Sequence, residues 1–258
     1  MLFRSGFAGG GARAAEDEAS GEAVKPGEAE KNWSIEAGYD YSSIYLFRGL
    51  NILDGNNISV PRVVVTVGGF SFYNYDYLGS LGANSLRYEE FDFGADYTFG
   101  LADDKLSFTF GGVKYAYGND DSGVNTYELY GSASLDVLLT PTITVWRDVK
   151  ALDSTFVAFD LSHSFDLTKP LHMGDDMAFS IDLIGEIGYD HDYVGPLFDE
   201  KRSGGAWNNA FFGIDFPFQA CEHFAIHASA QRSIALHALD INNRKDFTSY
   251  NFGATFSF

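Results

Sequence analysis

Hydrophobic and polar residues alternate strictly along residues 248–258. Phe252, Ala254, Phe256 and Phe258 share one face of a strand with Tyr250, and small or polar residues share the other, because successive strand side chains point to opposite faces. Aromatic residues on one face and small polar residues on the other are typical of a transmembrane β-barrel, whose outer face meets lipid. The segment therefore predicts a barrel strand.

The same alternation recurs upstream in residues 34–49, 86–100, 124–139 and 176–192. In each segment apolar and aromatic side chains share one face, and most charges lie on the other. In the first of them, Tyr45 and Phe47 are expected on the outer face and Arg48 on the inner face. A base near the bilayer midplane on the lipid face costs roughly 2–4 kcal/mol and an acid less, which explains the segregation.

Turn signals set the number of strands. Short links such as Thr140-Pro141 alternate with longer polar links such as Asp240–Lys245, and Gly68-Gly69 supplies a tight turn. The fold prediction is an all-β protein, a single antiparallel transmembrane β-barrel of about 12 strands over residues 33–258. The expected strands are 34–49, 59–67, 70–79, 86–100, 105–117, 124–139, 142–151, 154–168, 176–192, 205–219, 222–238 and 246–258. Several exceed the 9–11 residues of a crossing, so their outer ends are expected to project past the membrane.

The first residues do not share this pattern. Residues 1–15 are expected to be a residual or truncated signal segment, because Ala12-Arg13-Ala14-Ala15 is typical of the end of a signal peptide. Residues 16–32 are rich in Glu, Ala, Gly and Lys, which predicts a flexible acidic periplasmic extension. A disordered leader on a cytoplasmic protein is the alternative.

Amino-acid composition and net charge exclude several classes of protein and of site. The chain has 258 residues with 24 Phe, 15 Tyr and 28 Gly, yet no apolar run approaches the length of a spanning helix. A net charge of −19 argues against nucleic acid as a partner, since phosphate binding needs a basic patch. Cys221 is the one cysteine, which excludes an intrachain disulfide and a multi-cysteine metal site.

Charged residues on the inner faces are the candidate functional residues. The lumen is expected to be lined by Arg48, Asp92, Asp96, Glu128, Asp136, Asp160, Asp182 and Glu186. Rings of carboxylates favour cations, which predicts a cation-preferring path. In the alternative, a narrow lumen is closed because these acids pair with Arg48, Lys114, Arg147 and His227. Arg48 itself is either a latch or constriction charge, or a salt-bridged structural residue beside a glycine.

Signals for catalysis, cofactors or metals are weak. Ser162 and His163 are adjacent in a strand and point to opposite faces, so they do not form a catalytic dyad together. His223 and His227 lie roughly 13 Å apart along a strand, too far to share an ion. We expect no enzyme activity, no cofactor and no metal site.

The segment Tyr45-Leu46-Phe47-Arg48-Gly49, followed by Asp54-Gly55 and Pro61, resembles a motif of the TorF-type porin family. Tyr127-Glu128-Leu129-Tyr130 is similar to a later strand of that family. The chain departs from the family pattern after Pro61, where Arg62 and Val64 replace small and amide residues. The resemblance implies a β-barrel in the outer membrane of a Gram-negative bacterium more firmly than it implies a transport substrate.

The expected function is therefore that of an outer-membrane porin that allows passive diffusion of small polar solutes, with a cation preference. The alternative is a closed outer-membrane barrel with a structural role or a lipid-modifying enzyme activity. Expected partners are outer-membrane lipid, small solutes or ions, and the barrel-assembly machinery. The row Tyr250, Phe252, Phe256 and Phe258 resembles the assembly signal of bacterial outer-membrane proteins.

Overall fold

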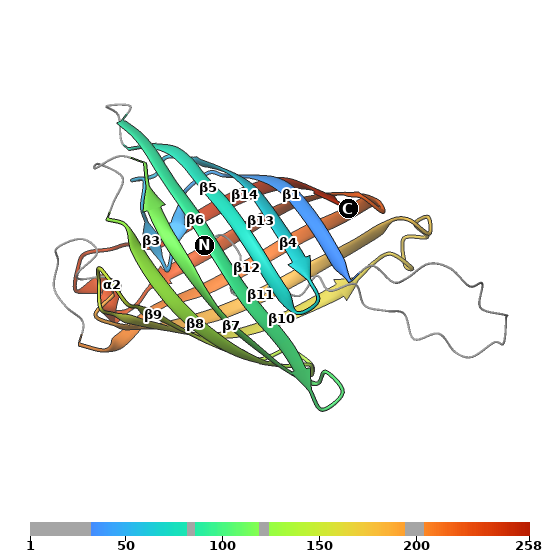
Figure 1. The fold of residues 1–258 in the computed structure, drawn as a ribbon. Coiled ribbons are helices and arrows are strands. Elements are labelled where there is room, and N and C mark those ends of the chain that lie inside the picture. The colour runs from blue at the N-terminus through green and yellow to red at the C-terminus, as the bar shows by residue number, and fades with distance from the viewer. Residues whose placement is uncertain (1–31, 82–85, 119–123, 194–203) are drawn as a thin grey trace.

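The strands of this chain close into a ring. The computed structural model describes residues 32–81, 86–118, 124–193 and 204–258, and in these ranges twelve long antiparallel strands form a closed barrel (Figure 1). The strands are β1 Trp33–Ser42, β4 Ile58–Val67, β5 Phe70–Leu81, β6 Leu86–Leu101, β7 Leu106–Tyr117, β8 Thr126–Leu135, β9 Thr142–Asp148, β10 Thr155–Asp166, β11 Ala178–His191, β12 Ala206–Cys221, β13 Phe224–Ala235 and β14 Phe247–Ser257. The predicted all-β barrel of about 12 strands is confirmed.

The first and last strands complete the ring. β1 pairs on one side with β14, where Tyr39 lies opposite Ala254, and on the other side with β4, where Tyr39 lies opposite Pro61. Two further backbone bonds of 3.1 and 2.9 Å join Ile35 and Phe258. Each of the twelve barrel strands therefore has two hydrogen-bonded neighbours, and the barrel sheet has no exposed edge.

The two ends of the barrel differ. We call the end with Trp33 and Ser257 the turn end; its links are residues 68–69, 102–105, 136–141, 167–177 and 222–223. We call the opposite end the loop end. It carries the connection from β1 to β4 and the short helix α2, His237–Asp240 (Figure 1). Within the described ranges, no helix is long and apolar enough to cross a membrane.

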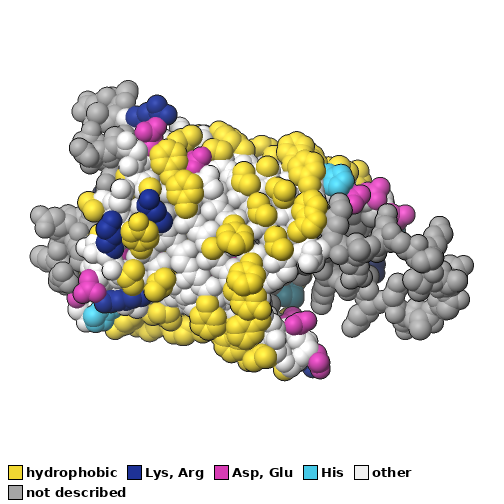
Figure 2. Space-filling model, viewed as in Figure 1, with side chains coloured by type: hydrophobic (Ala, Val, Ile, Leu, Met, Phe, Trp, Pro, Cys, Tyr) yellow, Lys and Arg dark blue, Asp and Glu magenta, His cyan; other side chains and the backbone are white. Residues whose placement is uncertain are grey.

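The outer surface of the barrel is apolar. Aromatic and aliphatic side chains such as Phe72, Phe93, Phe110, Leu183 and Phe252 point outward and are 42–55% exposed. Figure 2 shows hydrophobic side chains over the middle of one face, with most charged side chains towards its two ends. The faces predicted from alternation in residues 86–100 and 176–192 match the observed burial pattern of β6 and β11. The aromatic row of β14 also points outward.

The prediction for residues 34–49 was wrong beyond Ser42. β1 ends there, and the chain turns into the barrel as a small hairpin of β2, Leu46–Phe47, and β3, Leu50–Asn51. Arg48 and Gly49 form its two-residue turn, with φ angles of 49° and 78°. Such a turn usually carries Asn-Gly or Asp-Gly, so Arg-Gly gives little warning of it. Tyr45 and Phe47 are consequently buried inside the barrel rather than exposed outside.

The expected segments 1–15 and 16–32 lie outside the described residues, apart from Asn32. The closed sheet lies within the expected barrel range, 33–258, in which residues 82–85, 119–123 and 194–203 lie outside the described residues.

We call residues 43–57, which enter the barrel between β1 and β4, the plug.

The two faces of β11 yield a test of the barrel register. Leu183→Arg places a charge on the apolar outer face and is expected to destabilise the barrel in a bilayer by roughly 2–4 kcal/mol. Asp182→Asn changes the neighbouring inward residue, which accepts a hydrogen bond of 2.6 Å from Ser164 and keeps an acceptor after substitution. Urea unfolding of both variants in lipid vesicles measures the difference, and equal stability would contradict the assigned faces.

Candidate functional site

The loop end of the lumen is filled by an aromatic core. Tyr45, Phe47 and Leu53 of the plug are at most 7% exposed. They pack with buried barrel-wall residues, namely Ile58, Val60, Tyr77, Tyr88, Trp146, Phe156 and Ala158, and with Tyr193 from the link after β11. This part of the barrel therefore has an interior like that of a soluble protein, because the plug supplies apolar surface for the wall to pack against.

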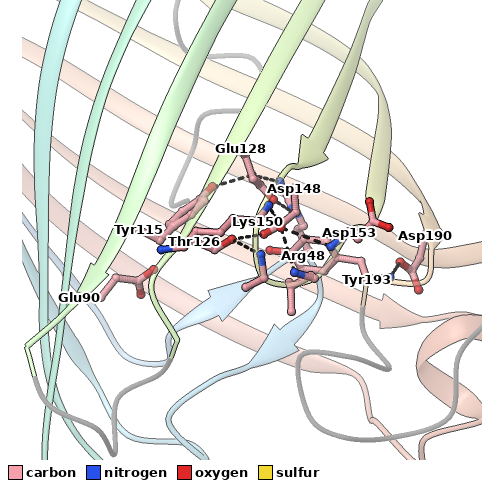
Figure 3. Close-up of polar contacts among 12 residues, drawn as sticks. Arg48, Glu90, Tyr115, Thr126, Glu128, Asp148, Lys150, Asp153, Asp190 and Tyr193 are labelled. Atoms are coloured by element: carbon pink, nitrogen blue, oxygen red, sulfur yellow. Dashed lines mark hydrogen bonds and ion pairs between the residues drawn. The ribbon is translucent and has the colours of Figure 1, made fainter.

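Arg48 lies within this aromatic core and makes the central ion pair of the plug. Its two terminal nitrogens donate to the two carboxylate oxygens of Glu128 at 2.7 and 2.8 Å (Figure 3). The side chains of Arg48 and Glu128 are 5% and 0% exposed. Tyr115 donates a third hydrogen bond of 2.8 Å to the same carboxylate. A buried ion pair needs this degree of hydrogen bonding to offset the cost of removing both charges from water.

Four aromatic rings surround the guanidinium group. Its central carbon lies 4.3–5.2 Å from the ring centroids of Phe47, Trp146, Phe156 and Tyr193. A cation within about 6 Å of an aromatic face is attracted by the ring quadrupole, and the attraction grows when water is excluded. Burial acts to lower the pKa of Arg48, but Glu128 outweighs it, and the pKa lies above its usual range. Arg48 is therefore a permanent cation inside a desolvated cage.

A second buried carboxylate, that of Glu90, binds the plug through Tyr45. Glu90 accepts hydrogen bonds from the hydroxyls of Tyr45 at 2.9 Å, Tyr88 at 2.5 Å and Tyr117 at 3.3 Å. Burial first and the Glu90 carboxylate second raise the pKa of Tyr45 well above its ordinary value, so Tyr45 remains a donor. A buried carboxylate is thus satisfied by hydroxyls of the wall and the plug together.

The plug backbone is anchored to the wall at its turn. The amide of Asn208 donates to the carbonyl of Arg48 at 2.8 Å. A Cβ atom on Gly49 would lie 2.9 Å from both Asn209 and Leu239, and the positive φ of Gly49 also disfavours a side chain. Leu239 of α2 packs against Leu50. The connection from β13 to β14 therefore helps to hold the hairpin in place.

The short β9–β10 link at the loop end is organised by Asp148. One oxygen of Asp148 accepts a 2.6 Å bond from Thr126, and the other accepts backbone bonds from Lys150, Leu152 and Asp153 (Figure 3). A carboxylate with this many local donors stabilises a tight turn. The arrangement explains how so short a link holds its turn at the loop end.

Nearer the turn end, the lumen wall is polar. Arg62 donates to Asp40 at 2.9 Å and to Thr255 at 2.6 Å. The two ring nitrogens of His227 lie 2.9 Å from an oxygen of Asp40 and 3.2 Å from an oxygen of Asp215. No sequence pattern predicts that these residues lie together. Their alternation places each on an inner face, but only the barrel register shows that they are neighbours.

The predicted lumen residues are distributed along the wall. Inward-facing positions on the strands hold Asp92, Asp96, Glu128, Asp160, Asp182 and Glu186. The register places Asp160 directly opposite Glu186, and Asp96 accepts a 2.7 Å bond from Tyr130. Asp136 is the exception. It lies in the exposed β8–β9 turn because β8 ends one residue earlier, at Leu135.

Two of the bases expected to neutralise these acids lie on the outside. Lys114 lies at an outward position of β7, next to inward-facing Val113 and Tyr115. Arg147 points outward from β9 and pairs with Asp153 in the adjacent link. Near the loop end the plug makes part of the interior apolar, so aromatic residues such as Trp146 and Phe156 join the polar residues on the inner face there. Of the four predicted bases, Arg48 and His227 pair with inward-facing acids.

The other chemical candidates lie apart. His163 points outward, and its ring centroid lies 4.6 Å from that of Phe165, whereas Ser162 occupies an inward position. Among the described residues, no three His, Cys, Asp or Glu side chains gather where they could hold a metal ion.

The aromatic half of the Arg48 site was missed by sequence reasoning. Trp146 and Phe156 face inward from β9 and β10, and Tyr193 follows β11. The alternation of β9 contains a signal, since Trp146 shares a face with Thr144 and Asp148. Nothing local indicates that Arg48 would reach these rings, because the contact spans nearly one hundred residues or more.

Comparison with known proteins identifies the fold. No protein-family model matches the sequence, and no curated protein matches it. A structure of KdgM porin is similar, with a TM-score of 0.52 and 11% identity over 87% of this chain and 99% of that chain. LpxR from Salmonella typhimurium is similar with a TM-score of 0.58 and 11% identity, over 86% and 99% of the two chains.

An outer membrane channel from Pseudomonas putida F1 is also similar, with a TM-score of 0.55 and 10% identity over 92% of this chain and 100% of that one. The fold is thus that of outer-membrane β-barrels, including porin-type barrels. Because one fold carries many functions, identities this low leave function to be argued from the residues.

The buried ion pair generates a stability prediction. Glu128→Gln leaves the Arg48 charge without its counter-ion and is expected to lower the free energy of unfolding by roughly 3–5 kcal/mol. The double variant Arg48→Met, Glu128→Leu removes both charges and is expected to recover most of that loss. Urea unfolding in lipid vesicles measures all three proteins, and a double variant less stable than Glu128→Gln would contradict the proposed coupling.

Proposed function

We propose that this protein is an outer-membrane porin that lets small polar solutes diffuse passively through its lumen, with a preference for cations. The carrying observation is the excess of inward-facing acids over bases. Beyond the paired Arg48, Arg62 and His227, the described strands present few inward bases, whereas acids line the wall at Glu36, Asp92, Asp96, Asp160, Asp182, Glu186 and Asp190. Carboxylates along a narrow path raise the local concentration of cations and repel anions.

The outer surface supports the location. A band of exposed aromatic and aliphatic side chains encircles the strands, and a water-soluble barrel would leave this surface in contact with water. Strands such as β6 and β12 are 16 residues long, more than the 9–11 residues that a tilted crossing needs. The turn end would face the periplasm and the loop end the exterior, as in other bacterial barrels.

The TorF-type porin family remains our proposal for the relationship. Its support is the motif at residues 45–49, in which each family residue has a role in the plug. Tyr45 binds Glu90, Phe47 lies against the guanidinium group, Arg48 pairs with Glu128, and Gly49 occupies a backbone position that excludes a side chain.

A closed barrel is the second candidate function. The observation that favours it is the plug itself, since buried aromatic residues fill the loop end of the lumen. In that case the protein would serve as a structural element of the membrane or as a lipid-modifying enzyme, and no solute would cross. Electrical recording separates the two proposals.

The pore predicts a selective conductance. Purified protein in planar bilayers is expected to conduct steadily and to prefer potassium over chloride. The preference is expected to weaken at high salt, because the Debye length falls from about 10 Å at 0.1 M to about 3 Å at 1 M. Asp182→Asn with Glu186→Gln is expected to shift the reversal potential towards that of anions while conductance persists.

Asp76→Asn provides the matched control for this experiment, since Asp76 lies on the outer face of β5, bonded to Asn74. It is expected to leave selectivity unchanged. A silent bilayer with correctly folded protein would support the closed barrel, and an anion preference would overturn the charge argument.

The outward row of β14 is our proposal for the assembly signal. Tyr250, Phe252, Phe256 and Phe258 are 51–63% exposed on one face, available to the assembly machinery before they meet lipid. Phe258→Ala is expected to lower the amount of protein assembled in the outer membrane several-fold. Ser257→Ala, one residue away on the inner face, is the control and is expected to assemble normally. Heat-modifiable gel migration measures assembly, and normal levels for both variants would remove the assignment.

A further inference from the structure

We propose that the barrel wall carries a binding site for small guanidinium-bearing solutes, formed by Glu128, Trp146 and Phe156, and that Arg48 of the plug occupies this site in cis. This proposal goes beyond passive diffusion, because it assigns a ligand class to a defined set of side chains. It does not depend on whether the barrel conducts.

The three wall residues form one continuous surface without the plug. Glu128 lies on β8, Trp146 on β9 and Phe156 on β10, three strands that are hydrogen-bonded in that order. The register pairs Phe156 directly with Trp146, whose ring centroids lie 6.0 Å apart. The sheet fixes the backbone positions of all three residues. A solute that replaced the Arg48 side chain would therefore meet the same carboxylate and the same rings.

The site is suited to a planar cation. Glu128 offers both oxygens to the two terminal nitrogens of Arg48 at 2.7 and 2.8 Å, a bidentate geometry that guanidinium matches and ammonium does not. The rings of Trp146 and Phe156 lie 5.2 and 4.8 Å from the guanidinium carbon. Aromatic rings and a carboxylate around a desolvated cation are the features by which proteins recognise organic cations.

A second observation points to a polar ligand. The indole nitrogen of Trp146 is buried and has no hydrogen-bond partner, although the residue is only 4% exposed. A buried donor is normally satisfied. The aliphatic stem of Arg48 has no acceptor to offer this nitrogen, so the cis occupant leaves one polar group of the cage unsatisfied.

The cis occupant also bears a strain that a free solute does not. Arg48 has a positive φ of 49°, a conformation that non-glycine residues rarely adopt. Its place is maintained by other plug contacts, namely the Asn208 bond to its carbonyl and the Tyr45 bond to Glu90. The Arg48 side chain would thus compete with a free solute for the site, and the plug contacts hold it there.

Removal of the Arg48 side chain tests the proposal. In a Trp33→Phe, Trp207→Phe background, Trp146 is the single tryptophan of the chain. Arg48→Ala in this background, folded in detergent, is titrated with methylguanidinium and with methylurea, its neutral isostere. We expect a saturable change in Trp146 fluorescence, with methylguanidinium bound more than about tenfold more tightly than methylurea. The same background with Arg48 intact is expected to show no saturable change.

Two further variants define the site. Glu128→Gln added to Arg48→Ala is expected to abolish the preference for methylguanidinium. Asp76→Asn, which neutralises a carboxylate on the outer face of β5, is expected to leave it intact. Folded Arg48→Ala that binds neither compound, or binds both equally, would overturn the proposal.

Should Arg48→Ala fail to fold, its refolding yield is measured instead, with millimolar methylguanidinium or methylurea in the buffer. Rescue by methylguanidinium alone supports the site, and rescue by neither or by both overturns it. Because fluorescence reads binding and not ion flow, saturable binding beside a silent bilayer would reject the porin function while retaining the site.

Discussion

The pairing of β1 with β14 joins the two ends of the sheet, and the remaining features of the molecule depend on it. Backbone groups on an open sheet edge would lack partners in a membrane, where water is absent. Closure removes both edges at once and separates an inner face from an outer face on every strand. The register around Tyr39, which lies opposite Ala254 on one side and Pro61 on the other, determines which inward residues become neighbours.

The barrel interior has a polar zone and an aromatic zone, in which charged groups are stabilised differently. Nearer the turn end, the wall is polar, and charges such as Asp40, Arg62 and His227 satisfy one another. At the loop end the plug supplies apolar side chains, and aromatic residues of the barrel wall pack against them. Two acids of the aromatic zone, Glu90 and Glu128, each accept three hydrogen bonds. A buried carboxylate there without donors would be strongly destabilising.

The structure of the plug explains the residue types of the Tyr-x-Phe-Arg-Gly motif at residues 45–49. The motif lies on an inward hairpin and not on an outward-facing strand, so its aromatic residues contact Glu90 and the guanidinium group instead of lipid. The same hairpin underlies the two readings of the protein. As a fixed element it favours the closed barrel, and in our further proposal its Arg48 side chain occupies a ligand site at Glu128.

The alternation of apolar and polar residues correctly predicted the barrel class, the outward rows of strands such as β6, β11 and β14, and most strand limits. It could do so because alternation is a local property with a period of two residues. Three features are visible only in the folded barrel: residues 43–57 turn inward, Lys114 and Arg147 face outward, and Arg48 pairs with Glu128. Those outcomes depend on contacts between distant segments. Where the plug fills the lumen, aromatic residues join the polar ones on the inner face, and no local pattern records that change.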